Sequence, residues 1–144
     1  AAIRIGEALP FVDLLKVSEE EVHLVGGAAG LAGCLKTHGI ALAVETLGAQ
    51  GARCHFAGET IDVPPVPAVA VDATGAGDAF WGAFLSHLVN HGVSRVGDLC
   101  SDLLRDAAAY GTAAGSLCVR SKGAIPALPT RAEILSLIKT EGVR

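Results

Sequence analysis

The first third of the chain alternates short apolar runs with helical patterns, and this alternation restricts the fold more than any other feature. Residues 12–17 have the length and composition of a strand, and the apolar run 40–44 suits a strand buried in a parallel sheet. Two helices are expected between them, the first ending at the glycines 26–27 and the second near Gly39. The order strand, helix, helix, strand is that of a βαβ unit, so an α/β fold is predicted.

Capping patterns mark the expected starts of two helices. Ser18 and Glu21 have S-x-x-E spacing at the start of the first helix, and Thr130 and Glu133 repeat this spacing ahead of a terminal helix through Ile134. In such a capping box each side chain bonds to a backbone N–H that the helix itself leaves without a partner.

The rest of the chain continues the same alternation. Residues 52–56 and 60–63 are expected to be extended, with a turn between them, and the prolines of 64–67 forbid a helix there. A helix is predicted from Asp78 to Gly92, and a longer, alanine-rich helix over 96–119. Alanine allows close packing, so this last helix is expected against other elements of the core.

Composition limits the size and class of the protein. The chain of 144 residues is long enough for one domain, or for part of one. Hydrophobic residues make up 51% and aromatic residues only 4%, so the core must consist of Ala, Val, Leu and Ile, which is typical of α/β packing. No apolar run reaches the roughly 18 residues needed to cross a bilayer. Because the sequence contains no methionine, we expect a processed chain or a piece of a longer one.

Charge and cysteine content argue against several partners. The net charge is −4 and no basic stripe is present, so no nucleic-acid partner is expected. The cysteines are widely spaced, without a C-x-x-C pair, and no signal-peptide pattern opens the chain. Reduced, buried thiols in a cytoplasmic protein fit this pattern best. The cysteines are Cys34, Cys54, Cys100 and Cys118.

A glycine-rich turn at Gly75, Ala76 and Gly77 leads into the helix that begins at Asp78. Small residues let a ligand approach the backbone closely, and backbone N–H groups at a helix start favour an anion. A phosphate would repel the carboxylate of Asp78, so that carboxylate suggests a general base. The alternative is structural, because the helix dipole favours Asp in a first turn and the glycines could form an ordinary tight loop.

Residues 72–80 resemble the signature of ribokinase-like (PfkB-type) carbohydrate kinases. Three further stretches are similar to the same family and follow its order, namely 16–21, 46–51 and 110–129. Within the last of them, residues 122–129 resemble fructokinases in particular. The resemblance covers nearly the whole chain. It implies a ribokinase-like three-layer α/β/α fold with a mostly parallel sheet, truncated at its N-terminal side.

The family's sugar-binding residues and β-sheet lid lie in an N-terminal half that nothing here resembles. Residues 1–144 are therefore expected to be the C-terminal nucleotide-binding and catalytic portion of a carbohydrate kinase domain. Without neighbours, strand 12–17 would expose an unpaired edge. Self-association, or assembly as a homo-oligomer, is expected through that surface.

The resemblance implies that Asp78 removes a proton from a sugar hydroxyl while the hydroxyl oxygen attacks the γ-phosphoryl group of ATP. The backbone N–H groups of Gly75, Ala76 and Gly77 would hold the phosphate oxygens. This agrees with the chemistry of the turn, because phosphoryl transfer needs positioning, charge stabilisation and a placed base.

Further roles come from the resemblance alone. Contacts to the nucleotide would come from Thr46, Gly48, Gly51, Gly77 and Thr112. Glu21 would act on Mg²⁺ through water, and a potassium site often found in the family would use Asp72 and Thr74. Carbonyl oxygens of Cys118, Gly123 and Ala127 would complete that potassium site.

Three positions depart from the family pattern or have a second explanation. Ser18 stands where many members have Asn, and a capping role explains it as well as a ligand contact does. Glu21 has the same alternative as the partner of Ser18 in the capping box. Thr112 replaces the Asn or His that is frequent near the nucleotide.

Two functions from different classes follow. The first is ATP-dependent phosphorylation of a sugar hydroxyl by a cytoplasmic, fructokinase-like enzyme. The alternative is a nucleotide- or phosphate-binding module that is catalytically silent. The two differ in whether Asp78 is needed for turnover.

Overall fold

The computed structural model describes residues 2–26 and 30–142. Within these ranges the strands form a four-stranded sheet in the order β1-β2-β3-β4. Strands β1 and β2 are parallel, whereas β2–β3 and β3–β4 are antiparallel. The strands are β1 (Leu14–Ser18), β2 (Leu42–Thr46), β3 (Ala52–Phe56) and β4 (Glu59–Val63).

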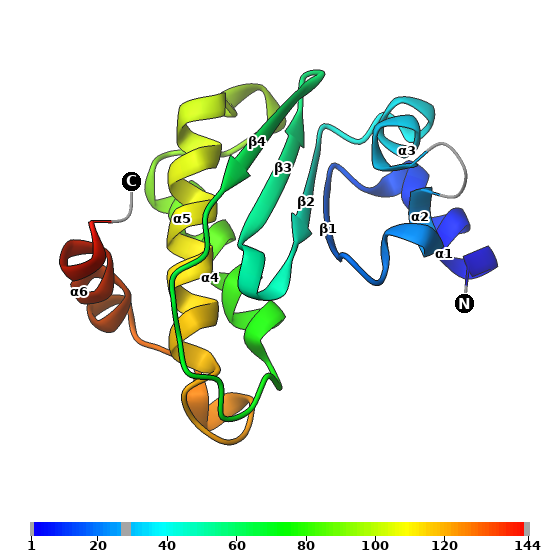
Figure 1. The fold of residues 1–144 in the computed structure, drawn as a ribbon. Coiled ribbons are helices and arrows are strands. Elements are labelled where there is room, and N and C mark those ends of the chain that lie inside the picture. The colour runs from blue at the N-terminus through cyan, green and yellow to red at the C-terminus, as the bar shows by residue number, and fades with distance from the viewer. Residues whose placement is uncertain (1, 27–29, 143–144) are drawn as a thin grey trace.

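Helices precede, connect and follow the strands (Figure 1). The α-helices are α1 (Ala2–Ala8), α2 (Val22–Gly26), α3 (Gly30–His38), α4 (Ala76–Asn90), α5 (Ser101–Cys118) and α6 (Arg131–Glu141). Short 3₁₀ turns are η1 (Leu9–Phe11), η3 (Gly48–Gln50), η4 (Val96–Asp98) and η5 (Ile125–Ala127). No helix in the described ranges is both long and apolar enough to span a membrane.

Alternating side chains of the first two strands contact opposite helical layers. Val17 of β1 and Ala43 of β2 are buried against Leu31 of α3. Leu42 and Val44 face the other way and pack in the cluster that contains residues of α4 and α5. Because successive side chains of a strand point to opposite faces, one strand pair is covered on both sides. The three-layer α/β/α arrangement expected from the sequence is confirmed.

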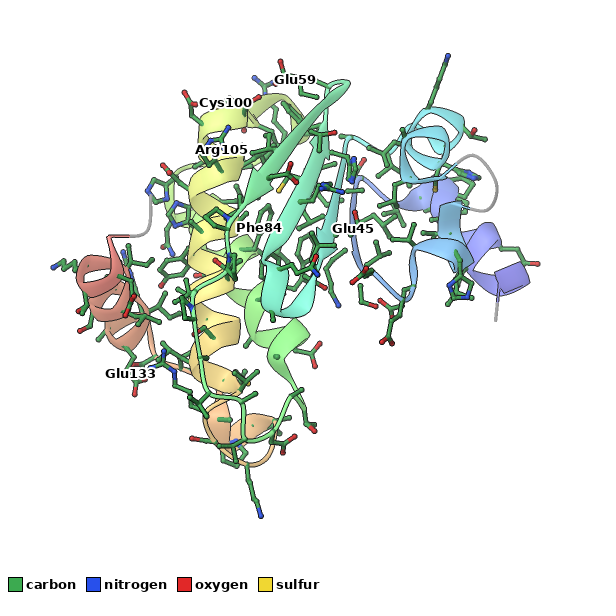
Figure 2. All side chains as sticks on the ribbon, viewed as in Figure 1. Glu45, Glu59, Phe84, Cys100, Arg105 and Glu133 are labelled. Carbon is green, nitrogen blue, oxygen red and sulfur yellow. The ribbon has the colours of Figure 1, made fainter. Side chains whose placement is uncertain are left out.

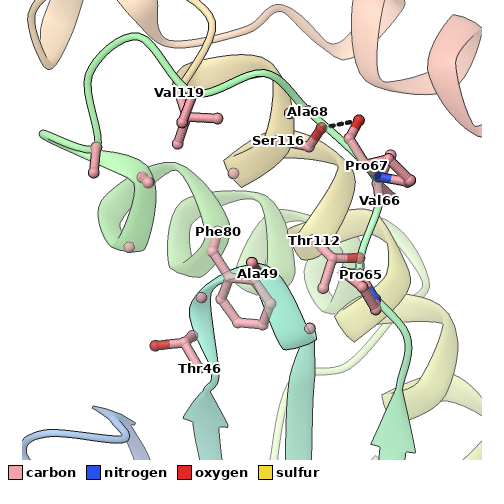
Figure 3. Close-up of a pocket in the computed structure, with 17 residues that line it drawn as sticks. Thr46, Ala49, Pro65, Val66, Pro67, Ala68, Phe80, Thr112, Ser116 and Val119 are labelled. Carbon is pink, nitrogen blue, oxygen red and sulfur yellow. Dashed lines mark hydrogen bonds between the residues drawn. The ribbon is translucent and has the colours of Figure 1, made fainter.

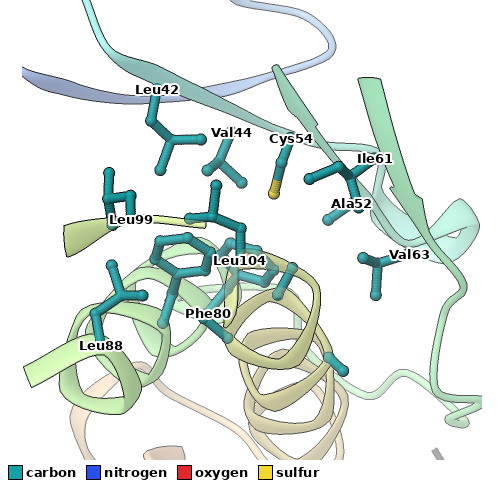
Figure 4. Close-up of a cluster of buried hydrophobic side chains, with 14 residues drawn as sticks. Leu42, Val44, Ala52, Cys54, Ile61, Val63, Phe80, Leu88, Leu99 and Leu104 are labelled. Carbon is teal, nitrogen blue, oxygen red and sulfur yellow. The ribbon is translucent and has the colours of Figure 1, made fainter. Parts of the chain in front are cut away.

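The main core lies between the sheet and helices α4 and α5 (Figure 4). Phe84, Leu42 and Leu104 are fully buried there. Figure 2 shows Phe84 in the interior, whereas Glu59 and Glu133 lie at the periphery. Truncating a buried leucine of this kind to alanine typically costs about 2–5 kcal/mol. The few aromatic rings and many small aliphatic residues of this core agree with the composition.

The sheet differs from the mostly parallel one that was expected. Two of its three pairings within the described residues are antiparallel. The connection from β2 to β3 contains only the short turn η3, and a parallel neighbour would need a crossover of a dozen residues or more. The parallel part of the sheet is the β1–β2 pair, which two helices connect.

Several predicted boundaries shift. The predicted first strand is found at 14–18 and the second at 42–46, and α4 begins at Ala76 rather than Asp78. The continuous helix predicted over 96–119 is wrong at its start, because η4 precedes it and α5 begins at Ser101. The expected helix stop at 26–27 agrees with the end of α2 at Gly26, while Gly27 lies outside the described residues.

The Asp98 carboxylate explains the break before α5. It accepts hydrogen bonds from the backbone N–H groups of Ser94 and Arg95, which close a separate turn. These bonds also lower the pKa of Asp98, the Ser94 N–H having the largest effect. Leu99 and Cys100 are then extended, and a new helix starts after them.

Candidate active site

A pocket of about 510 Å³ lies beyond the end of β2, between the β2–β3 turn, the extended segment after β4, and helices α4 and α5 (Figure 3). It brings together every residue expected to contact a nucleotide. Those lining residues are Thr46, Gly48, Gly51, Gly77 and Thr112. They come from three separate parts of the chain, so the pocket exists only in the folded molecule.

The β2–β3 turn forms one wall of the pocket. The Leu47 N–H donates to the Gly51 carbonyl oxygen at 2.9 Å and closes the turn. Gly51 has a φ of 97°, and a Cβ there would lie 2.2 Å from the carbonyl oxygen of Val63. Only glycine fits a position with both a left-handed backbone and such a close approach.

Apolar side chains form most of the remaining wall. Phe80 projects toward the pocket from α4, and Pro65, Val66 and Pro67 face it from the extended segment (Figure 3). Sequence reasoning missed these contacts, because helical spacing does not show which neighbours Phe80 meets and the prolines were interpreted only as breakers of helical structure. A mostly apolar cavity with few polar groups suits a flat aromatic ring.

The hydroxyl groups at the pocket already have backbone partners. Thr46 donates to the Val17 carbonyl oxygen at 3.4 Å, and Thr112 donates to the Ala109 carbonyl oxygen at 2.9 Å. Ser116, one helical turn after Thr112, donates to Pro67 at 3.5 Å. Each hydroxyl oxygen keeps lone pairs, so these side chains could accept a hydrogen bond from a ligand.

The glycine-rich turn lies beside this pocket at the start of α4. Gly75 precedes the helix with a φ of 83°, and a Cβ there would lie 2.8 Å from the Ala124 side chain. Ala76 and Gly77 line the pocket. The Ala76 N–H donates to the Ala73 carbonyl oxygen at 3.2 Å. Within the described ranges the N–H groups of Gly75 and Gly77 have no hydrogen-bond acceptor, as expected at a helix start.

Asp78 is exposed in the first turn of α4. It borders a second, smaller cavity of about 280 Å³, together with Ser86, Tyr110 and Arg131, and is not part of the lining of the larger pocket. Asp78 therefore follows the glycine-rich turn directly in sequence and is exposed, outside the lining of the larger pocket.

Glu21 forms one half of the expected capping box. Its carboxylate accepts a hydrogen bond from the Ser18 backbone N–H at 2.8 Å. Its own N–H donates to the Ser18 carbonyl oxygen rather than to the hydroxyl group, and α2 begins only at Val22. The pKa of Glu21 is lowered, chiefly by hydrogen bonding to Ser18 and to a smaller extent by the positive charge of Lys16. Over the described ranges no three His, Cys, Asp or Glu side chains cluster as ligands for a metal ion.

The residues expected at a potassium site meet in one loop region. Asp72 accepts hydrogen bonds from the N–H groups of Thr74 and Gly123, both at 2.9 Å. These bonds, that from Gly123 first, lower the pKa of Asp72 to about 2. The Cys118 thiol lies 3.8 Å from the Thr74 carbonyl oxygen, and Cys118 packs with Ala127. Asp72 thus joins two loops that are distant in sequence.

A pocket at the carboxyl end of a parallel strand pair, next to a glycine turn that opens a helix, is typical of α/β proteins that bind phosphorylated ligands. Residues 2–131 match the family model described as pfkB family carbohydrate kinase. The chain therefore belongs to the pfkB family of carbohydrate kinases.

Curated relatives and solved structures are similar over nearly the whole chain. Probable fructokinase-5 of Arabidopsis thaliana is 38% identical, with 90% of this chain matching 40% of the relative. Fructokinase of Klebsiella pneumoniae is 34% identical, over 88% of this chain and 41% of the relative. The chain thus spans about two-fifths of the length of these relatives.

The structure of a fructokinase with bound ATP from Xylella fastidiosa superposes with a TM-score of 0.88 at 25% identity, over 98% of this chain and 47% of that one. A fructokinase from Vibrio cholerae, described with fructose, ADP and calcium ion bound, gives a TM-score of 0.79 at 30% identity, over 94% and 44%. The ribokinase-like fold expected from the sequence is confirmed.

Proposed function

We propose that this chain is the nucleotide-binding and catalytic part of a kinase that transfers the γ-phosphoryl group of ATP to a sugar hydroxyl, as fructokinases do. The observation that carries the proposal is the shared lining of one pocket. Residues named for nucleotide contact from separate sequence stretches surround it, and Gly77 joins it to the phosphate-binding turn. Relatives named fructokinase and neighbours described with ATP, ADP and fructose support the substrate class.

The two parts of the site suit the two parts of a nucleotide. The apolar wall around Phe80 fits the base, whereas the start of α4 fits the phosphates. The unbonded N–H groups of Gly75 and Gly77 and the helix dipole both favour negative charge there. Charge that develops on the transferring phosphoryl group would be stabilised at this turn.

Asp78 serves as the base in this proposal. It is the acidic residue of the first turn of α4, it is exposed, and it follows the turn directly. As the sugar oxygen forms its bond to the γ-phosphorus and the bond to the ADP oxygen breaks, the hydroxyl proton passes to the Asp78 carboxylate.

The residues present fit a Mg²⁺ ion whose ligands come mainly from the phosphates of the nucleotide. Mg²⁺ commonly takes one or two carboxylates and otherwise water and phosphate oxygens, and the described residues offer no denser cluster. When bound, the ion would neutralise phosphate charge. Glu21, already oriented by Ser18, would act on it through water.

The loop held by Asp72 is proposed as the potassium site. The Asp72 carboxylate accepts a hydrogen bond from the Gly123 N–H, and the other expected ligand residues surround or adjoin this loop. Those residues are Thr74, Cys118, Gly123 and Ala127. Potassium would stiffen the turn that leads into α4. A full-length kinase with equal rates in potassium and in tetramethylammonium salts would contradict this site.

The kinase function is tested by Asp78→Asn in the full-length kinase. We expect the sugar-dependent kcat to fall by about 10²–10⁴-fold, because a positioned base contributes about that much, while ATP binding measured by calorimetry is retained. Asp102→Asn is the matched control, since Asp102 is also an exposed acid in the first turn of a helix.

A silent binding module would behave differently. Such a module would bind ATP but show no sugar-dependent ADP release in the unaltered full-length protein. An Asp78→Asn rate equal to that of the unaltered kinase would reject Asp78 as the base. The 144-residue chain alone is expected to bind nucleotide without turnover, because the resemblance places most of the sugar site in the other half.

A further inference from the structure

Lys16 of β1 reaches the glycine-rich turn at the start of α4. An ideal Cβ atom built on Gly77 would lie only 3.1 Å from the Lys16 ammonium nitrogen and 3.8 Å from its Cε. The alternation along β1 accounts for this direction. Val17 faces α3, so Lys16 shares the face of Leu14, which packs toward α4 and α5.

No carboxylate of the described residues forms a direct ion pair with this ammonium group, although its positive charge acts on nearby Glu21. The ion pairs found there are Arg53–Asp62, His55–Glu45 and Arg95–Asp98. None of them involves Lys16, and no hydrogen bond from its ammonium group to the described residues is present. Lys16 is only partly exposed. A partly buried ammonium group without a hydrogen-bond acceptor favours an anion beside it.

The position of Lys16 adds to this argument. The start of a helix carries partial positive charge, so a lysine beside the start of α4 is repelled by the helix dipole. Two positive groups from different elements therefore face one small space. An anion placed between them would be attracted by both. Without an anion, the two positive groups repel each other.

The nearby Lys16 ammonium group also explains why position 77 is a glycine. Gly77 lies inside α4 and is absent from the positive-φ positions, so its backbone conformation does not require glycine. Glycine is also a poor helix former. The nearby atoms that a side chain at position 77 would meet are those of Lys16. A missing side chain here keeps room for the ammonium group over the turn.

We propose that Lys16 is a further catalytic residue, which donates hydrogen bonds to the terminal phosphoryl group of the nucleotide as it moves to the sugar. The proposal rests on the kinase function above. The lysine keeps its proton throughout. The bond from phosphorus to the ADP oxygen breaks, the bond to the sugar oxygen forms, and the hydroxyl proton passes to Asp78, while Lys16 stabilises charge on the transferring oxygens.

Lys16→Met in the full-length kinase is the first test. Methionine keeps the approximate length of the side chain and removes its charge. We expect kcat to fall by about 10²–10³-fold, as for loss of one preorganised donor. Calorimetry should show weaker binding of ATP but ADP affinity within about threefold, because ADP lacks the terminal phosphate. Lys36→Met, at an exposed lysine of α3, is the control and should change neither value.

Gly77→Ala provides a second test. Because alanine favours a helix, this variant is expected to fold even if Lys16→Met does not. The added methyl group should displace the ammonium group and lower kcat while ADP affinity is retained. In a double-mutant cycle, Gly77→Ala should have little further effect once Lys16 is Met. Additive losses would show that Gly77 acts independently of Lys16 and would overturn this part of the proposal.

The outcomes separate the two proposals. An unchanged kcat and an unchanged ratio of ATP to ADP affinity in Lys16→Met, with turnover still lost in Asp78→Asn, would reject the role of Lys16 and leave the kinase function standing. Normal turnover in Asp78→Asn would reject the assigned base. An equal loss of ATP and ADP affinity in Lys16→Met would also overturn the proposal, because the lysine would then contact parts common to both nucleotides.

Discussion

Individual residues near the site carry both structural and chemical roles, and Asp72 illustrates how the two combine. Its carboxylate accepts backbone hydrogen bonds from Thr74 and Gly123, and these bonds hold the approach to α4 against the loop before η5. Charged acceptors make stronger hydrogen bonds than neutral ones. The same residue is a proposed potassium ligand, so changes at this position should affect both the stability and the ion response.

The lowered pKa of Asp72 predicts a pH dependence of stability. Its pKa is about 2, below the ordinary value of 3.8, so the folded protein binds this proton more weakly than the unfolded chain does. The stabilisation should be complete above about pH 4 and be lost as the pH falls toward 2. Melting temperatures should therefore differ most between the unaltered chain and Asp72→Asn above about pH 4, and converge toward pH 2. A constant difference across this range would contradict the prediction.

At the scale of elements, the packing of α4 on α5 depends on one glycine. A Cβ on Gly111 of α5 would lie 2.9 Å from ring carbons of Phe80 and 3.1 Å from its carbonyl oxygen. The two helices can approach closely because no side chain separates them there. Phe80 also lines the pocket, so this contact links the packing of the helices to the shape of the site.

Gly111→Ala is predicted to destabilise the protein by about 1–3 kcal/mol, because overpacking outweighs the better helix propensity of alanine. Gly82 of α4 is the matched control, since nothing lies within 4 Å of a Cβ built there. Gly82→Ala should stabilise by up to about 1 kcal/mol. Urea unfolding of both variants measures the two values. Stabilisation by Gly111→Ala would show that the helices can separate at little cost.

Some elements could be predicted from the sequence because their signals are local. The Thr130–Glu133 capping box is present, with the Glu133 N–H donating to the Thr130 hydroxyl oxygen and the Thr130 N–H to the Glu133 carboxylate. The start of α5 could not be predicted from helical spacing alone. There the Asp98 side chain closes a competing turn, and hydrogen bonding of that kind favours caps and turns over helix interiors.

At the scale of the whole molecule, β1 pairs with β2 and has no second strand neighbour in the described residues. Its other edge presents backbone N–H and C=O groups that can pair with another chain. Large apolar side chains are also exposed, among them Phe11 and Val89. The chain spans about two-fifths of the length of its curated relatives, so in those proteins the matching region is one part of a longer chain.

The isolated chain is therefore predicted to self-associate. Light scattering should show a mean mass that rises with protein concentration, because an open strand edge and exposed apolar surface both favour association. Adding the preceding half of a full-length kinase as a separate chain should reduce this association if the half covers the same edge. Monodisperse monomers with one cooperative melting transition would contradict the prediction.

Local patterns in the sequence determined the α/β class, most elements and the glycine turn, because hydrophobic period, capping and positive-φ glycines act over a few residues. The contiguous signature around Asp78 likewise indicated the kinase family, which the family match confirms. Only the tertiary structure decided that Phe80 faces the pocket and that Lys16 stands over Gly77. Such contacts join segments far apart along the chain, and their geometry depends on how whole layers pack, which no local pattern encodes.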